Sequence, residues 1–372
     1  MLPEWFNSWN RDNPAKNLFG PAVLVGVAGG AVLVAALLVA FGQPLATKSM
    51  QTGPRGTGMV VSKFVTDIET ADPTIADYYT EAPYVPEEGA ELAKDIYENV
   101  QVLGEVTTDN FNRLMLAMTQ WVAPEQGCGY CHAGADEGNY AADDAYTKVV
   151  ARRMIQMTQN INEYWAGHVN ANAEVGVTCY TCHRGQNVPS EIWFKIDPVN
   201  EAMSGWSANQ NRVTVQSQYT SLPSDALEAY LLNGEQIGVH NLEAHVAESP
   251  ADEGVRTWQQ TERTFSLMNY VANSLGVNCT FCHNTRAFYD GAQVTPQWST
   301  ETLGIQMVLE LNNDYLVPLA SEYPENRLGP VHGDAPKAAC KTCHKGYQQP
   351  MQGMNVISDW PELATTGAPV YE

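Results

Sequence analysis

The feature that most restricts the fold of this 372-residue chain is a five-residue frame, Cys-x-x-Cys-His, which occurs four times. The four copies occupy residues 128–132, 179–183, 279–283 and 340–344. Together they use all eight cysteines, so we expect none to be left for a disulfide or for a lone nucleophile. Each copy must form a short turn that presents two sulfurs and one imidazole together.

This frame is typical of c-type haem attachment. Two thiols three positions apart on a short helical turn can form thioethers with the two vinyl groups of one porphyrin, and the next His reaches the iron. Zinc sites do not need a His directly after each Cys-x-x-Cys pair, and thioredoxin-like pairs usually occur once per domain. The chain is therefore predicted to bind four covalently bound c-type haems through Cys128, Cys131, Cys179, Cys182, Cys279, Cys282, Cys340 and Cys343, with the proximal ligands His132, His183, His283 and His344.

Each iron needs a second axial ligand unless it is left open for chemistry, and Met and His are the usual candidates. Methionines lie on predicted helices that precede the motifs. The candidates are Met115 or Met118 for the first haem, Met154 or Met157 for the second, and Met268 for the third. A single Met at helical spacing is more often a core residue. Spacing alone does not choose within either pair.

Four histidines lie outside the motifs: His168, His240, His245 and His332. For the fourth haem the candidates are His168, His332 and Met307. His168 lies about four helical turns after Met154, so one long helix could serve two haems. His240 and His245 are expected to be surface or packing residues.

An apolar segment near the N-terminus predicts a membrane anchor. Residues 18–46 contain no charged side chain, and residues 21–41 are almost entirely Ala, Val, Leu and Gly. This exceeds the roughly 18–20 apolar residues that a helix needs to cross a bilayer, whereas a cleavable signal peptide usually has an apolar region of about 7–15 residues. We expect a retained, single-pass anchor. Because bacteria attach c-type haem outside the cytoplasmic membrane, the large C-terminal part should be periplasmic.

The rest of the chain is predicted to be mainly α with many loops. Apolar periodicity predicts helices over residues 109–122, 146–169, 261–275 and 302–316. The first cysteines of successive motifs are 51, 100 and 61 residues apart, which indicates two pseudo-repeated two-haem units separated by an insertion. The insertion could hold short strands, for example at 211–218. The predicted divisions are a cytoplasmic tail (1–17), a transmembrane anchor (18–46), an extended connector (47–90), a unit for haems 1 and 2 (91–189), an insertion (190–249) and a unit for haems 3 and 4 (250–372).

Charge restricts the partners. The chain has 20 Lys and Arg against 42 Asp and Glu, a formal net charge of −22. This argues against nucleic acid, which needs a basic face. An acidic surface can steer a basic partner, although it can also serve only solubility.

Longer stretches around the motifs resemble one known family, the tetrahaem cytochrome c subunit of the purple bacterial photosynthetic reaction centre. The resemblance covers nearly the whole predicted periplasmic part. It is carried by residues 51–56, 99–104, 121–124, 150–154, 176–185 and 275–284. Two departures are the uncleaved anchor, where some members begin at a lipidated Cys, and a slightly longer connection at 169–175.

The resemblance implies three haems with His/Met ligation and one with His/His ligation. Matched position by position, Met115 would ligate haem 1, Met154 haem 2, Met268 haem 3 and His168 haem 4. Met118, Met157 and Met307 would then be packing residues.

The resemblance also implies a function in electron transfer and no catalytic residues. A soluble cytochrome c or high-potential iron–sulfur protein would deliver electrons, and the chain would re-reduce the photo-oxidised bacteriochlorophyll special pair. The implied partners are the reaction-centre L, M and H subunits in the bacterial inner (photosynthetic) membrane, with a light-harvesting antenna as a further candidate. The alternatives are a membrane-anchored tetrahaem quinol dehydrogenase and a multihaem reductase with an open haem.

Overall fold

The computed structural model describes residues 3–14, 19–41, 46–53, 59–69, 72–134, 138–171, 175–197, 209–239, 258–288 and 290–371. The chain forms two compact units, residues 1–50 with 62–71, and residues 51–61 with 72–372. The described residues are mainly helical with many loops, as predicted, and contain one two-stranded sheet.

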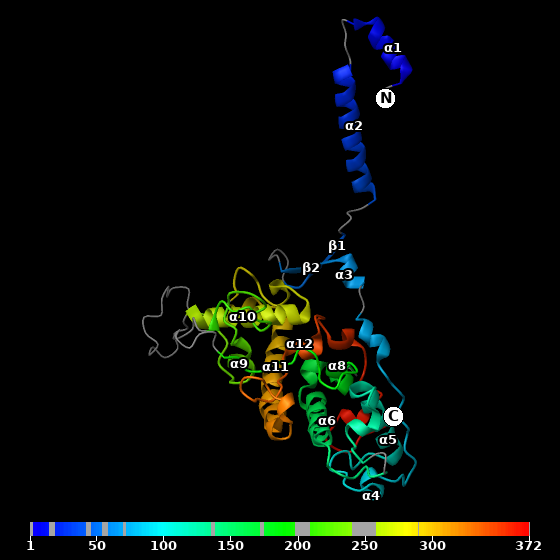
Figure 1. Cartoon of the computed structure of the whole chain (residues 1–372), viewed down its shortest axis with the longest axis vertical. Coiled ribbons are helices and arrows are strands. Elements are labelled where there is room, and N and C mark those ends of the chain that lie inside the picture. Colours follow the sequence, from blue (N-terminus) through cyan, green and yellow to red (C-terminus); the bar gives the residue numbers. More distant parts are fainter. Residues whose placement is uncertain are drawn as a thin grey trace. The chain divides into compact units, whose positions relative to one another are not determined.

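The first unit contains the apolar helix predicted near the N-terminus. A short helix, α1 (Glu4–Asp12), precedes the long helix α2 (Phe19–Ala40), both labelled in Figure 1. The 22 residues of α2 give a helix about 33 Å long, which matches the roughly 30 Å core of a bilayer. Its described apolar side chains are largely exposed, so no other described segment covers them.

The predicted connector is more structured than its composition indicated. Strand β1 (Thr47–Gln51) pairs with β2 (Val60–Phe64), and the short helix α3 (Val65–Glu69) follows. A hydrogen bond of 2.7 Å joins the Ser49 and Ser62 hydroxyls across the sheet. Beyond α3, Asp72 caps a 3-10 turn, η2 (Pro73–Asp77), by accepting from the Thr74 amide at 3.0 Å.

The second unit holds all four motifs. Its α-helices are α4 (Ala93–Ile96), α5 (Thr108–Val122), α6 (Tyr146–Tyr164), α7 (Ala166–Val169), α8 (Cys179–His183), α9 (Ala226–Leu231), α10 (Trp258–Leu275), α11 (Pro296–Glu310) and α12 (Cys340–His344). Its short 3-10 and π turns are η3 (Gly127–Tyr130), η7 (Cys279–Phe281), η8 (Gly291–Gln293), η9 (Leu311–Leu316), η10 (Val317–Ser321), η11 (Glu325–Arg327), η12 (Pro350–Gly353) and η13 (Pro361–Leu363).

All four predicted helices are confirmed, with differences at two of them. Helices α5 and α10 match the predictions for 109–122 and 261–275 closely. The helix predicted over 146–169 breaks at Trp165 into α6 and α7. The helix predicted over 302–316 begins earlier, at Pro296, because Pro fits the first turn of a helix, and its last part is the π turn η9.

The strands predicted in the insertion are wrong for its described part. Residues 190–197 and 209–239 contain turns, α9 and one isolated β-bridge at Trp193, but no strand. The Ser217 hydroxyl donates to the Arg212 carbonyl at 3.1 Å, and the Ser217 amide donates to the Thr214 hydroxyl at 3.1 Å. Such local side-chain bonds close the backbone into turns instead of leaving it for a sheet.

Two apolar cores stabilise the second unit. One lies around α5 and includes Leu114 and Trp121, while the other lies among α9, α10 and α11. The chain after α12 returns to the first core, where Trp360 packs edge-on against Trp121 with ring centroids 4.7 Å apart. The last part of the chain thus stabilises the region around the first two motifs.

The order of elements around the motifs repeats. The succession α5, η3, α6, α8 recurs as α10, η7, α11, α12. Equivalent hydrogen bonds join the copies internally: the Gly185 amide donates to the Trp121 carbonyl at 2.9 Å, and the Gly346 amide donates to the Ser274 carbonyl at 2.8 Å. The second unit therefore contains two structurally similar halves.

A buried Asn marks the same place in each half. Asn162 accepts from the Val177 amide at 2.8 Å and donates to the Val177 carbonyl at 2.9 Å. Asn312 accepts from the Ala338 amide at 2.9 Å and donates to the Ala338 carbonyl at 3.0 Å. Both partners lie two residues before the first Cys of a motif, so each Asn fixes the entry of the chain into that motif.

Candidate cofactor site

The second and fourth motifs form matching helical turns, α8 and α12. In each, a Thr hydroxyl inside the motif accepts a backbone amide just before it: Thr181 from Thr178, and Thr342 from Ala339, both at 3.0 Å. The residue after each His has a left-handed backbone and is followed by Gly, which ends the helix at once. The two turns therefore present their sulfurs and imidazoles alike.

The first and third motifs form looser 3-10 turns, η3 and η7. Their first cysteines, Cys128 and Cys279, are exposed, and Cys131 and Cys282 are partly buried. Burial raises the pKa of Cys131 to about 11 and that of Cys282 to about 12. Both sulfurs are thus thiols at neutral pH.

Three proximal histidines have one ring nitrogen fixed by a backbone carbonyl. The Nδ1 atom lies 3.0 Å from the Tyr140 carbonyl in His132, 2.8 Å from Gln186 in His183, and 3.1 Å from Tyr347 in His344. A carbonyl only accepts, so Nδ1 carries the proton and Nε2 is left as a ligand. Burial lowers the pKa of all four motif histidines, and that of His344 to about 4, which favours the neutral imidazole that binds iron.

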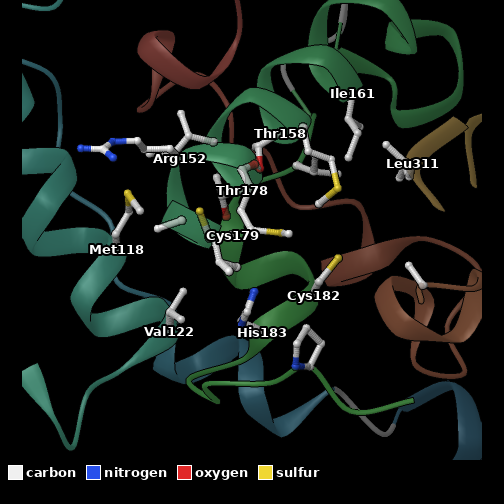
Figure 2. Close-up of a pocket in the computed structure, with 18 of the residues that line it drawn as sticks. Met118, Val122, Arg152, Thr158, Ile161, Thr178, Cys179, Cys182, His183 and Leu311 are labelled. Atoms are coloured by element: carbon white, nitrogen blue, oxygen red, sulfur yellow. Dashed lines mark hydrogen bonds between the residues drawn. The ribbon is translucent and has the colours of Figure 1, made fainter. Parts of the chain in front are cut away.

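A cavity of about 1230 Å³ lies between these elements. A site for one drug-sized ligand usually has about 300–1,000 Å³, so the cavity has room for more than one such group. Figure 2 shows Met118 and Val122 on one side, Leu311 on the other, and Cys179, Cys182 and His183 between them. The predicted site residues that line it are Met115, Cys128, Cys131, His132, Met154, His168, Cys179, Cys182, His183, Cys340, Cys343 and His344, together with the alternatives Met118, Met157 and Met307.

The third motif lies mostly outside this cavity and contributes Phe281 to its lining. Met268 is half-buried against the core among α9, α10 and α11. Trp121 and Ser274 accept the equivalent hydrogen bonds of the two halves. When the halves are aligned on these two residues, Met115 of α5 corresponds to Met268 of α10. The two candidates for haems 1 and 3 are therefore equivalent.

His168 faces His344. Their ring centroids are 6.3 Å apart, and the Nδ1 of His168 lies 2.9 Å from the Thr300 carbonyl. If both rings bound one metal ion, the distance between their centroids would be two metal–nitrogen bonds of about 2 Å plus the distance from each nitrogen to its ring centre. This sum is close to the separation found here. Burial also lowers the pKa of His168. These two residues thus fit two ligands of one iron.

Gly304 on α11 makes room for His168. A Cβ atom at this position would overlap the Cε1 atom of the His168 ring. When the two halves are aligned with Asn162 on Asn312, Met154 corresponds to Gly304 and Met157 corresponds to Met307. The second half therefore has no side chain at the position of Met154, and His168 from the first half occupies that space. Sequence reasoning missed Gly304, because its role depends on a contact with another helix.

The remaining histidines do not line the cavity or lie outside the described residues. The Nε2 atom of His332 is 2.8 Å from a carboxylate oxygen of Asp197, and its side chain is 41% exposed. His240 and His245 lie outside the described residues.

One feature differs from the expectation that no cysteine forms a disulfide. Cys182 of α8 is joined to Cys343 of α12, with Cα atoms 4.5 Å apart, and the other six cysteines are free. The two second cysteines meet because α8 packs directly against α12. The sequence held no sign of this contact between motifs two and four.

The helices place the motifs in a spatial order that differs from their order in the chain. Helix α8 packs against α5 and α12, and α12 packs against α10 (Figure 1). The second and fourth motifs therefore lie in the middle, next to each other, with the elements of the first and third motifs on either side.

Comparison with known proteins agrees with these features. The family model described as photosynthetic reaction centre cytochrome C subunit matches residues 42–364. The photosynthetic reaction center cytochrome c subunit of Roseobacter denitrificans is 68% identical over 372 residues, 100% of both chains. The subunit of Thermochromatium tepidum is 39% identical over 95% of this chain and 82% of its own, and that of Rubrivivax gelatinosus is 38% identical over 92% and 90%. With its haem-attachment frames and its full-length similarity to these subunits, the chain belongs to the family of photosynthetic reaction centre cytochrome c subunits.

Proposed function

We propose that this chain binds four haems, takes electrons from a soluble periplasmic carrier and re-reduces the special pair. Family membership establishes the coarser part: the chain is a reaction-centre cytochrome c subunit, an electron carrier and not an enzyme, with covalent c-type haems. The four motifs support the proposed number of haems. When bound, the haems supply one-electron redox chemistry.

The observation that carries the proposal is the pairing of His168 with His344. Both Nδ1 atoms are held by backbone carbonyls, which leaves Nε2 as the ligand atom of each ring, and the 6.3 Å between the ring centroids would suit two ligands of one iron. This supports His/His ligation at the fourth motif. A reductase would need an iron with an open position, and the second imidazole beside His344 argues against one at the fourth motif.

The similar halves support the other ligands. Met115 and Met268 occupy equivalent positions in the two halves. Met154 corresponds to Gly304, and the His168 ring fills the space that a side chain at Gly304 would need. We therefore propose that Met115, Met154 and Met268 ligate haems 1, 2 and 3, and that Met118, Met157 and Met307 pack. Met ligation raises the reduction potential relative to His ligation, so the chain makes its four sites unequal.

A thioether and a disulfide exclude each other at one sulfur. We propose that Cys182 and Cys343 each form a thioether with haem, so that no bond joins the two sulfurs in the haem-loaded chain. Their Cα atoms are 4.5 Å apart, so the attachment cysteines of the second and fourth motifs lie next to each other.

The apolar helix α2 is proposed to cross the inner membrane once, with the second unit in the periplasm. As a reaction-centre subunit the chain is membrane-associated and joins the reaction-centre complex. The proposed partners there are the L, M and H subunits, with an antenna protein as a candidate neighbour of α2. A soluble cytochrome c or high-potential iron–sulfur protein is the proposed donor.

Two measurements test the proposal on the full chain. Intact mass should show four covalent haems and no disulfide, and a flash should oxidise c-type haem in membranes that contain the reaction centre. Fewer than four haems, or a retained bond between Cys182 and Cys343, would contradict the attachment scheme. Carbon monoxide binding by the reduced protein would favour a reductase instead.

A further inference from the structure

Helix α11 carries a buried carboxyl group that the proposed ligation does not use. The Oε1 atom of Glu301 and the Oε1 atom of Gln297, one turn away, are both buried without a hydrogen-bond partner among the described residues. Both side chains line the cavity. A buried polar atom without a partner is unusual and calls for a functional reason.

Glu301 lies between the third and fourth motifs. Its negative charge contributes to the raised pKa of Cys282 in the third motif and of Cys340 in the fourth. On its own helix it sits between Thr300, whose carbonyl accepts from His168, and Gly304, against which the His168 ring packs. The titratable groups that face its side chain are thus Cys282 beside η7 and Cys340 of α12.

In the described part of the chain, no positive side chain neutralises this carboxyl group. Among the residues that the structure describes, Glu301 forms no ion pair with a Lys, Arg or His. Burial raises its pKa to about 7, so its charge changes near neutral pH. In a poorly hydrated site an unpaired charge acts over a longer range than at the surface.

The other half of the unit lacks this charge. In the alignment that matches Asn162 with Asn312, Glu301 corresponds to Ala151 of α6. Ala151 also lines the cavity. The carboxyl group is therefore specific to the half that holds the third and fourth motifs.

We propose that Glu301 tunes the reduction potentials of the haems at the third and fourth motifs, and that its charge distinguishes this half from the other. The inference rests on the proposed function. A carboxylate stabilises Fe(III) relative to Fe(II) and so lowers the potential. Where the group titrates, reduction takes one electron from the soluble donor and one proton from water, which binds the carboxylate; oxidation returns the electron to the special pair and the proton to water.

The test is a spectroelectrochemical titration of the haem-loaded full chain between pH 5.5 and pH 9, with Glu301→Gln compared with the unaltered protein. At pH 9 the substitution should raise the potential of at least one haem of the second half, changing its reduced-to-oxidised ratio about tenfold, or about 59 mV for one electron. At pH 5.5, where the carboxyl is protonated, the two proteins should agree. The reduction potentials of the haems at the first and second motifs should not change.

Two further variants separate tuning from a structural role. Glu310→Gln removes the same charge at the end of the same helix, away from the cavity lining, and should leave all potentials unchanged. Ala151→Glu places a carboxyl at the equivalent position and should lower the potential of a haem in the first half at high pH.

Several results would overturn the inference. They are a pH-independent potential for every haem of the unaltered protein, equal shifts in Glu301→Gln and Glu310→Gln, or a shift confined to the first half. If Glu301→Gln does not load haem, the pH profile of the unaltered protein and the Ala151→Glu variant decide the question. An unaltered chain without c-type absorption would instead refute the proposed function.

Discussion

Gly304 packs directly against His168, the proposed second ligand of the fourth haem. Its missing side chain leaves the space that the His168 ring fills, and any Cβ there would overlap that ring. We expect Gly304→Ala to push the His168 ring away from His344. Helix α11 should stay intact, because Ala is a better helix former than Gly. The His/His signature of one haem should be lost from the low-temperature electron paramagnetic resonance spectrum.

The matched control is Gly291→Ala in η8, where a Cβ would meet nothing within 4 Å. That variant should keep all four haem signatures. If Gly304→Ala also keeps the His/His signal, His168 is not the ligand that the geometry indicates, and His332 or Met307 has to be reconsidered.

A second prediction at the residue scale concerns a buried ion pair. Arg113 and Glu362 are joined at 2.7 Å with side chains only 1% and 0% exposed, and the Arg113 guanidinium lies 4.1 Å from the centroid of the Trp360 ring. Glu362→Gln would leave the Arg113 charge buried and unpaired. We expect it to lower the free energy of unfolding by about 3 kcal/mol at pH 8, measured by denaturant titration.

The exposed pair of Lys94 and Glu105 provides the control, because it has a similar distance of 2.6 Å. Glu105→Gln should cause no measurable change, since solvent screens this pair. A comparable loss in both variants would show that burial does not set the contribution of the Arg113 pair.

At the scale of elements, each half depends on one Asn that fixes the chain before a motif. Asn162→Ala should leave the Val177 amide and carbonyl unpaired, at a cost of about 1–3 kcal/mol for each buried group, and Asn312→Ala should do the same at Ala338. The first variant should reduce haem attachment at the second motif, and the second variant at the fourth. Mass spectrometry of the haem peptides would measure both.

The two variants are controls for each other. Equal losses at both motifs in both variants would mean that the halves do not fold as separate environments. Loss of the first or third haem alone would contradict the role assigned to these two residues.

For the whole molecule, the net charge of −22 is the property that a soluble partner meets first. If a basic cytochrome is the donor, its association rate should fall as ionic strength rises, because salt screens attraction between exposed charges. Stopped-flow or flash kinetics between low and physiological salt would measure this. A rate that stays constant or rises with salt would indicate an apolar docking contact, and the acidic surface would then serve solubility.

The sequence alone determined the features that depend on local chemistry. A five-residue frame needs only one short turn to bring two sulfurs and an imidazole together, so the attachment residues could be predicted without a fold. Apolar periodicity located α5, α6, α10 and α11, and the uncharged run located α2. The strands predicted at 211–218 failed because local bonds from Ser217 favour turns there.

Only the tertiary structure decided how these parts meet. Helical spacing offers both Met154 and Met157 as candidate ligands. The contact of His168 with Gly304, the residue equivalent to Met154, supports the proposal that Met154 ligates and Met157 packs. The packing of α8 on α12, which places the second motif next to the fourth, likewise joins segments far apart in the chain. The periodicity of a helix determines which side chains share a face. Which other face it meets depends on how the whole chain closes around its cores.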